Sequence, residues 1–479
     1  AAKLALGTFT GITDGVDAQT DGYELEPPDQ GLAVGQGVIF EINNNTLQLF
    51  RTNGRPLTLP VFTATFFNVN PDFNQVILSD PHVLYDPSSR RWFVDELVYS
   101  LDGSFSGFAI AVSQTSDPAG AYNLYQARAF SDDLGGCGST DCLADFPQVG
   151  YDANAYFIAS DLFDFTSSNF VATGLYVFPK LRLERGASIR YLRFTSDDFV
   201  MQPSVPALGE PFATADNGTE YLMTARNIVD GSNRIRVVAI VNTAEIAAAP
   251  RRLRGFFTEI RGQPYGQPVP QTEPDVVGPY CQSQGVTSAP LLDGGYGAFG
   301  SNIVLAGGKL FGALTSGAVI ALNQIGNVIA YFVVAPTLAA KAVTAAIVKQ
   351  GYLVPPRGFS LSYPALALQA SGRGVLGMSI TGSKAAAVGG FPSAAVTRFR
   401  RSTPSPDIVV SGQGDTSDDG FSGCQTAGPG GIGRWGDYGA ATVDPATGFF
   451  YTANEYIPEA AKYPRGPAAN WGTLVTRTQ

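Results

Sequence analysis

The sequence predicts an all-β protein that is built as a single β-propeller, and three observations support this. Gly and Pro account for 55 and 32 of the 479 residues, which is rich in turns but below the level of a disordered chain. Charged residues make up only 15%, which disfavours long solvated helices. A short β run, a tight turn and a second, aromatic-rich β run recur along the chain. Each such unit is too small to bury both of its faces, and radial stacking of the units supplies the missing core.

The repeated units define the expected blades. In the clearest copies the turn is Asp86–Ser89 or Asp444–Gly448, with Asp and Pro at the first positions, as is typical of type I turns in hairpins. We expect seven blades, with six or eight as alternatives because the fifth and sixth copies are degenerate. The units start at Gly31, Asp80, Asp145, Gln202, Gly300, Tyr363 and Asp437.

The whole chain, residues 1–479, is expected to form one domain with insertions near 243–270 and 335–360. Thr243–Ala249 and Thr337–Lys349 are rich in Ala and predict short helices there. The run Leu4–Thr13 is expected to join the last blade and close the ring. The alternative is a pair of β-sandwich domains, which would not explain why Asp or Pro repeatedly begins a strand.

Charge and hydropathy exclude two classes of partner. The net charge is −10, and the chain has no basic stripe that could bind a nucleic acid backbone. The longest apolar run, Val328–Ala340, contains Pro336 and is shorter than the roughly 20 residues that cross a bilayer. We therefore expect neither a nucleic acid partner nor a membrane span.

Cysteine usage indicates an oxidising environment. The short spacing of Cys137 and Cys142 allows a small disulfide-closed loop, which leaves Cys281 and Cys424 as a long-range pair. The alternative is four free thiols in a cytosolic protein. The sequence starts at Ala1 without Met, as expected of a processed product whose signal peptide has been removed. These features predict a secreted, extracellular or cell-surface protein.

Both ends of the chain carry motifs that resemble a family of exported bacterial β-propeller proteins for which no common activity is assigned. The resemblance implies the propeller architecture and export, and it implies no particular activity. The C-terminal motifs are Arg434–Tyr438, Val443–Pro445, Phe449–Tyr451, Asn454–Tyr456 and Trp471–Thr473, and the N-terminal ones are Pro28–Gly35, Glu41–Asn44 and Asn53–Gly54. Asp80-Pro81 with Trp92-Phe93 matches the blade between.

Residues that begin equivalent innermost strands should converge on one rim of the central channel. They are Asp29, Asp80, Asp145, Gln202, Tyr363 and Asp437. Four carboxylates around one opening repel one another unless a cation or protonation relieves them. Asp29, Asp80, Asp145 and Asp437 are therefore candidate ligands of Ca²⁺, which prefers oxygen. The alternative is that they cap turns. His82, the only histidine, lies two residues after Asp80 and is expected on the same face of its strand.

These residues support two classes of function. The first is a binding or structural module for an extracellular polysaccharide or surface protein, stiffened by calcium and able to self-assemble. Its ligand would contact Asp29, Asp80, His82, Gln202, Tyr363, Arg434 and Asp437. The alternative is a glycan-active hydrolase or lyase, because paired carboxyl groups can cleave glycosides. Its catalytic candidates are Asp80, Asp145, Asp437 and Glu455, with Arg434 holding an anionic group.

Overall fold

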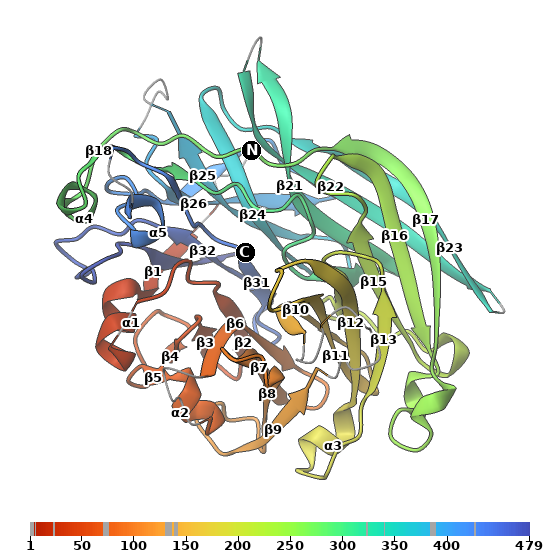
Figure 1. Cartoon of the computed structure of the whole chain (residues 1–479). Coiled ribbons are helices and arrows are strands. Elements are labelled where there is room, and N and C mark those ends of the chain that lie inside the picture. The colour runs from red at the N-terminus through yellow and green to blue at the C-terminus, as the bar shows by residue number, and fades with distance from the viewer. Residues whose placement is uncertain are drawn as a thin grey trace.

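The computed structural model describes residues 4, 6–22, 24–69, 76–129, 137, 142–321, 324–339, 341–383, 389–425 and 428–479. Antiparallel sheets follow one another around a common centre from the N-terminus to the C-terminus (Figure 1). In each of them the chain runs from an innermost strand outward, so that consecutive strands are neighbours. The protein is an all-β propeller, as the sequence predicts.

The first three sheets have four strands each. The first contains β2 (Gly31–Gly35), β3 (Val38–Ile42), β4 (Thr46–Arg51) and β5 (Val61–Phe62). The second contains β6 (Val76–Asp86), β7 (Arg91–Ser100), β8 (Ser106–Ser113) and β9 (Tyr122–Arg128). The third contains β10 (Leu143–Tyr151), β11 (Ala155–Phe163), β12 (Phe170–Pro179) and β13 (Leu192–Ser196).

Two further four-stranded runs join into one eight-stranded sheet. The first run is β14 (Gln202–Pro206), β15 (Thr219–Ala225), β16 (Ser232–Val241) and β17 (Arg254–Tyr265). The second is β20 (Ile303–Ala306), β21 (Lys309–Ala321), β22 (Gln324–Ala339) and β23 (Ala342–Leu353). The innermost strands β14 and β20 pair in parallel, with Ser204 opposite Ile303. The two edge strands of this sheet, β17 and β23, contact each other through a side chain. The side-chain amide of Gln263 on β17 donates to the backbone carbonyl of Gly351 on β23 at 2.7 Å.

The last two sheets complete the ring. One contains β24 (Phe359–Leu368), β25 (Gly374–Gly382), β26 (Ser393–Arg400) and β27 (Thr403–Pro404), with β28 (Val409–Gly412) also paired to β26. The other contains β31 (Ala440–Val443), β32 (Phe450–Tyr456), β33 (Gly472–Thr478) and the N-terminal strand β1 (Leu6–Thr13). Leu6 pairs with Thr478. The predicted closure of the ring by the N-terminal strand is therefore confirmed, whereas the number of blades stays a prediction because two runs share one sheet.

Short elements occupy the connections. The helices are α1 (Asp14–Asp21), α2 (Thr63–Phe67), α3 (Lys180–Glu184), α4 (Pro279–Ser283) and α5 (Phe421–Cys424), with 3-10 turns at Ala215–Asn217, Thr243–Glu245 and Pro250–Arg252. Two small parallel pairs join β18 (Val286–Ser288) to β29 (Gly428–Pro429) and β19 (Leu291–Leu292) to β30 (Ile432–Gly433). None of the described helices is long and apolar enough to cross a membrane.

The prediction of a helix over Thr337–Lys349 is wrong, because this segment contains the end of β22 and most of β23. Val343, Ala345 and Ile347 alternate with outward-facing residues and pack against the apolar core of the eight-stranded sheet. Burial of every second side chain favours a strand here and outweighs the helical propensity of the alanines. Thr243–Glu245 forms only a 3-10 turn. The two expected insertions, 243–270 and 335–360, hold the edge strands β17 and β23.

Both predicted disulfides are present. Cys137 is bonded to Cys142, and Cys281 is bonded to Cys424. The second bond joins α4 to α5, and its two cysteines are 143 residues apart in the chain. The alternative of four free thiols is therefore wrong.

Candidate functional site

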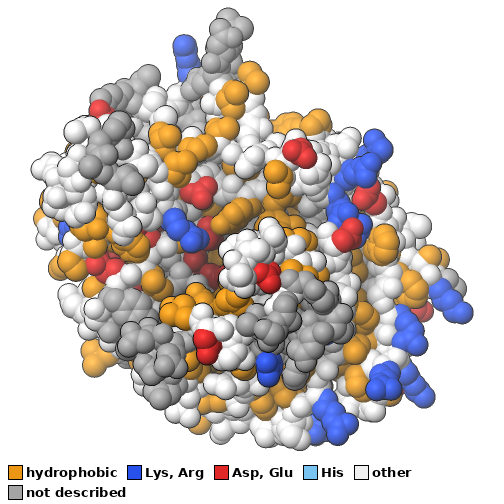
Figure 2. Space-filling view, viewed as in Figure 1, with side chains coloured by type: hydrophobic (Ala, Val, Ile, Leu, Met, Phe, Trp, Pro, Cys, Tyr) orange, Lys and Arg blue, Asp and Glu red, His pale blue; other side chains and the backbone are white. Residues whose placement is uncertain are grey.

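A cavity of about 420 Å³ lies where the innermost strands of several sheets begin. Figure 2 shows acidic side chains beside a Lys or Arg side chain in a hollow near the middle of one face. We call this space the axial cavity. Its polar lining includes Asp29, Asn44, Asp80, Asp145, Asp161, Tyr296, Arg434 and Asp437. The rim therefore brings together the four aspartates and the arginine that the sequence singles out.

An unusual backbone conformation recurs before or in the first half of the innermost strands. Six non-glycine residues there have positive φ, namely Asp29, Asp80, Phe146, Val200, Tyr363 and Asp437. The first, fourth and last of these precede their strands, whereas the other three lie within β6, β10 and β24, where the strand register shifts. Positive φ is disfavoured for residues with a side chain, and most strongly for bulky or β-branched ones. Such strain persists only where the surrounding structure fixes the backbone, and it concentrates at functional sites. The register of β6 shifts between Ser79 and His82, beside Asp80.

Asn44, in the turn between β3 and β4, holds two of the aspartates in place. Its Nδ2 atom donates to Oδ2 of Asp29 at 2.8 Å, and its Oδ1 atom accepts the backbone N–H of Asp80 at 2.7 Å. Asn44 is itself buried, so it is not an accessible glycosylation site. The Oδ1 atom of Asp29 is buried and has no hydrogen-bond partner among the described residues.

Asp80 and Asp145 form a carboxyl pair. Oδ2 of Asp80 accepts the backbone N–H of Phe146 at 3.1 Å. Burial, and after it the charge of the nearby Asp145, raise the pKa of Asp80 to about 7. Burial and Asp437 raise the pKa of Asp145 as well.

Asp437 has a different partner. Its Oδ2 atom forms an ion pair with Arg434, whose side chain is 49% exposed, while its Oδ1 atom is buried without a partner among the described residues. Burial raises the pKa of Asp437 to about 7, although Arg434 acts to lower it. Burial alone would lower the pKa of Arg434, but Asp437 and Asp29 outweigh this and raise it. The cavity therefore combines two neighbouring carboxyl groups, whose pKa values are both raised, with a third carboxyl group that is paired to a cation.

Aromatic rings border the same cavity. Phe146 and Tyr296 both line it, and their ring centroids are 5.9 Å apart in an edge-to-face arrangement. Tyr296 is 43% exposed, and the charge of Asp437 is the main cause that raises the pKa of its hydroxyl. Tyr99, Phe163 and Phe199 complete the aromatic lining.

The other predicted site residues do not reach the axial cavity. Gln202 is buried and hydrogen-bonded to Gln148, because Val200 takes the rim position in its strand. Glu455 is buried and accepts the backbone N–H of Gly436 at 2.7 Å. Tyr363 lines a small neighbouring cavity of about 20 Å³ that Asp437 and Tyr296 share.

His82 lies in a separate cavity of about 30 Å³. Its ring stacks on Tyr438 with a centroid distance of 4.9 Å. Burial lowers the pKa of His82 to about 4, so the imidazole is neutral at physiological pH.

The carboxyl groups are not arranged as a calcium cage. Among the described residues, the only three acidic or sulfur-bearing side chains with ligand atoms within 4.8 Å of one another are Cys281, Asp419 and Cys424. The two cysteines there are joined in a disulfide. Ca²⁺ takes six to eight oxygen ligands at short distance, and Asp29, Asp80, Asp145 and Asp437 do not present three carboxyl oxygens that close together.

Sequence reasoning did not assign several polar residues to the axial cavity, among them Glu26, Asn44, Asp161 and Tyr296. Asn44 belongs to the N-terminal motif Glu41–Asn44, so that motif offered a signal. Asp161 lies on β11, the second strand of its sheet, and Tyr296 lies in the connection before β20. Neither begins an innermost strand, so the repeat could not reveal them.

No family model matches the chain, and no curated protein matches its sequence. Several solved structures are similar in fold. A GH43 β-1,3-galactosidase with galactodeoxynojirimycin is 11% identical, with 71% of this chain and 97% of that chain covered and a TM-score of 0.32. The Trypanosoma rangeli sialidase with the inhibitor DANA is 9% identical, with 94% of this chain and 60% of that chain covered and a TM-score of 0.34. An exo-β-1,3-galactanase from Clostridium thermocellum is 11% identical, with 97% of this chain and 96% of that chain covered and a TM-score of 0.31.

Proposed function

We propose that this protein is a glycan-active β-propeller that binds a saccharide in the axial cavity and cleaves it by carboxyl acid–base chemistry. The observation that carries the proposal is the contrast between two carboxyl environments in one cavity. Asp80 lies near the carboxyl group of Asp145, which raises its pKa, whereas Asp437 is ion-paired with Arg434, which acts to lower its pKa. Environments that separate the protonation states of two carboxyl groups assign the acid and the base. Glycoside cleavage uses one carboxyl group in each role.

In this mechanism Asp80 is the proton donor and Asp437 is the carboxylate. The charge of Asp145 favours the protonated form of Asp80, and Arg434 favours the charged form of Asp437. Asp80 would donate its proton to the leaving glycosidic oxygen as the glycosidic bond breaks, and so become a carboxylate. As base, Asp437 would take a proton from the water that adds to the anomeric carbon; as nucleophile, it would form an ester with that carbon, which water then hydrolyses. Phe146 and Tyr296 supply apolar surface against which a sugar ring can stack.

The second candidate is a binding module that uses the same cavity without cleavage. The aromatic rings that border the cavity favour it, and they serve either function. The two disulfides are consistent with an extracellular protein, for which a polysaccharide is an available partner. We include in the proposal that the protein is secreted or located at the cell surface.

The test incubates the purified protein with a panel of polysaccharides and measures both bound protein and released reducing ends. We expect release to be greatest near pH 7 and to fall on both sides, because Asp80 loses its proton above about pH 7 and Asp437 gains one below it. Asp80→Asn and Asp437→Asn should each lower release at least 100-fold while binding persists. Asp230→Asn, at an exposed position, is the matched control and should leave release unchanged.

Release that survives in both cavity variants would overturn the catalytic assignment. Binding by the unaltered protein without any release would instead support the binding module. Circular dichroism of each variant excludes unfolding as the cause of a loss.

A further inference from the structure

A second and larger cavity, of about 670 Å³, lies on the outside of the ring. Strands β12 and β13 of the third sheet form one wall, and β16 and β17 form the other. We call it the interblade groove. Its lining includes five buried apolar side chains, namely Leu175, Met201, Val238, Ile240 and Leu253. Volume and lining both match those of sites that bind small, mainly apolar molecules.

A glycine keeps the groove open. Ile240 pairs with Gly255 and Val238 pairs with Phe257 across β16 and β17, so all four residues share the face that lines the groove. A Cβ atom on Gly255 would lie 3.3 Å from Cδ1 of Ile240 and 3.9 Å from Cδ1 of Phe194 on β13. A larger side chain at this position would therefore fill the groove. Gly255 has no positive φ, so the backbone accepts a substitution.

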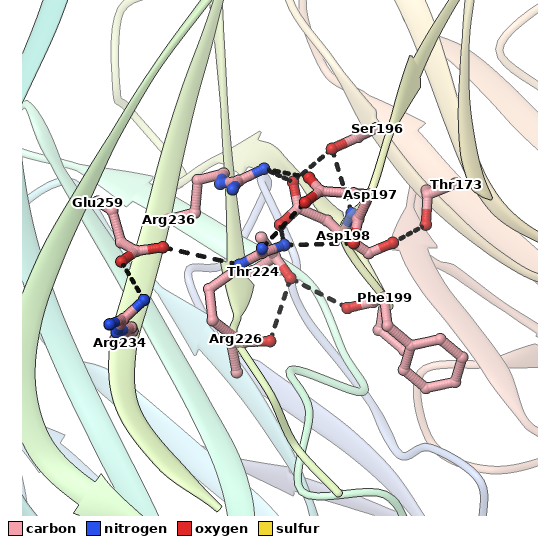
Figure 3. A network of polar contacts seen from close by, with 12 residues as sticks. Thr173, Ser196, Asp197, Asp198, Phe199, Thr224, Arg226, Arg234, Arg236 and Glu259 are labelled. Carbon is pink, nitrogen blue, oxygen red and sulfur yellow. Dashed lines mark hydrogen bonds and ion pairs between the residues drawn. The ribbon is translucent and has the colours of Figure 1, made fainter. Parts of the chain in front are cut away.

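The other end of the groove is polar (Figure 3). Nη1 of Arg236 contacts Asp197 at 2.8 Å and Asp198 at 2.9 Å, and the guanidinium lies 4.6 Å from the ring centroid of Phe257. The Nε–H of Arg236 is buried and has no hydrogen-bond partner among the described residues. That atom has no accessible surface, so a ligand in the groove would accept from the outer nitrogens of the guanidinium.

One arginine of the groove is left for an anionic acceptor. Three arginines balance three acids in the network, namely Arg226, Arg234 and Arg236 against Asp197, Asp198 and Glu259. The groove lining itself contains two acids, Asp197 and Asp198, and two arginines, Arg236 and Arg254, so its formal charges balance. Arg254 has no acid partner in this network, so it is the arginine that an anionic group can pair with. Phe257, at the side of the groove, is 64% exposed and offers an apolar surface next to Arg236.

We propose that the interblade groove binds a linear carboxylate amphiphile, such as a medium-chain fatty acid. The alkyl chain lies on the apolar floor and against Phe257, and the carboxylate accepts from Arg236 and Arg254. The groove and the axial cavity share no lining residue, although Thr173 of the groove donates to Asp161 of the axial cavity. The proposal stands independently of glycan cleavage.

The test measures fluorescence of anilinonaphthalene sulfonate, an apolar anionic dye, and its displacement by dodecanoate below the concentration at which micelles form. We expect one dye molecule bound per chain and full displacement by dodecanoate. Gly255→Leu should weaken binding of both probes at least 10-fold, because the leucine fills the groove without touching the ion network. Phe257→Ser should weaken binding, whereas the matched control Leu59→Ser, which removes an apolar side chain that is 83% exposed elsewhere, should not.

Dodecanol has the same chain without the carboxylate and should bind at least 10-fold more weakly than dodecanoate. Equal affinity for the two would overturn the role of Arg236. Unchanged dye binding in Gly255→Leu, with thermal unfolding as in the unaltered protein, would overturn the site itself. Displacement of the dye by oligosaccharides and not by dodecanoate would overturn the proposed ligand class.

Discussion

The carboxyl group of Asp80 accepts the backbone N–H of Phe146 at 3.1 Å, and the backbone N–H of Asp80 donates to Asn44 at 2.7 Å. Asn44 belongs to the first sheet, Asp80 to the second and Phe146 to the third. The hydrogen bonds of one aspartate therefore span three successive sheets. The geometry of the axial cavity depends on how these sheets pack against one another.

Replacing Asn44 by Ala should disturb two aspartates at once. The change removes the donor to Asp29 and the acceptor for Asp80, and buried groups that lose their partner cost about 1–3 kcal/mol. We expect urea unfolding at lower concentration and a larger loss in turnover than in binding. Asn169→Ala, at an exposed position, is the control. Equal effects of the two variants would contradict the role of Asn44.

The protein should be more stable at pH 5 than at pH 8. Burial raises the pKa of Glu41 to about 8 and that of Asp95 to about 8, whereas these groups have pKa values near 4 in the unfolded chain. Above pH 4 the unfolded chain releases protons that the folded protein keeps. Each such group therefore lowers the free energy of unfolding as the pH rises from about 4 to about 8, by up to about 1.4 kcal/mol per pH unit.

The urea midpoint measured from pH 4 to pH 9 tests this prediction. Glu41→Gln keeps a neutral hydrogen-bonding group beside Thr473 and should flatten the slope. Glu459→Gln, on the surface, should leave the slope as it is. A midpoint that rises between pH 5 and pH 8 would show the sign to be wrong.

Lys180 should be essential for stability through its buried ion pair. Its Nζ atom contacts Asp86 at 2.9 Å, with side-chain exposures of 5% and 1%, and donates to the carbonyl of Asp152 at 2.7 Å. Removal of one partner from a buried pair costs about 3–5 kcal/mol, because the other charge stays buried and unpaired. We expect Lys180→Met to be more destabilising than the double variant Lys180→Met, Asp86→Asn. A double-mutant cycle by urea unfolding measures the coupling, and additive effects would contradict it.

The two disulfides should contribute unequally. In the chain-entropy model, the Cys281–Cys424 bond, with a sequence separation of 143, stabilises by about 5 kcal/mol. The Cys137–Cys142 bond, with a separation of 5, contributes about 2 kcal/mol. Thermal unfolding of the two double Cys→Ala variants should show the larger loss for the long-range pair. A larger loss for the short loop would contradict the entropic account.

Local patterns in the sequence determined the strands and their turns. The Asp86–Ser89 turn is an example, because Oδ1 of Asp86 accepts the backbone N–H of Ser88 at 2.8 Å, a bond between residues two positions apart. The N-terminal run Leu4–Thr13 predicted the closure of the ring, and β1 pairs with β33. The alanines of residues 337–349 led to the wrong prediction of a helix, because helix propensity is a weak local preference that packing overrides.

The sequence by itself determined that carboxyl groups recur at the start of the innermost strands, since that repeat is visible in Asp29, Asp80, Asp145 and Asp437. Only the tertiary structure decided which of them lie near another carboxyl group and which is ion-paired. It also decided that Val200 and not Gln202 reaches the cavity, and that Asn44 and Tyr296 join it. The physical reason is that pKa shifts and cavity shape depend on burial and on contacts between different sheets, and no spacing along a single strand contains that information.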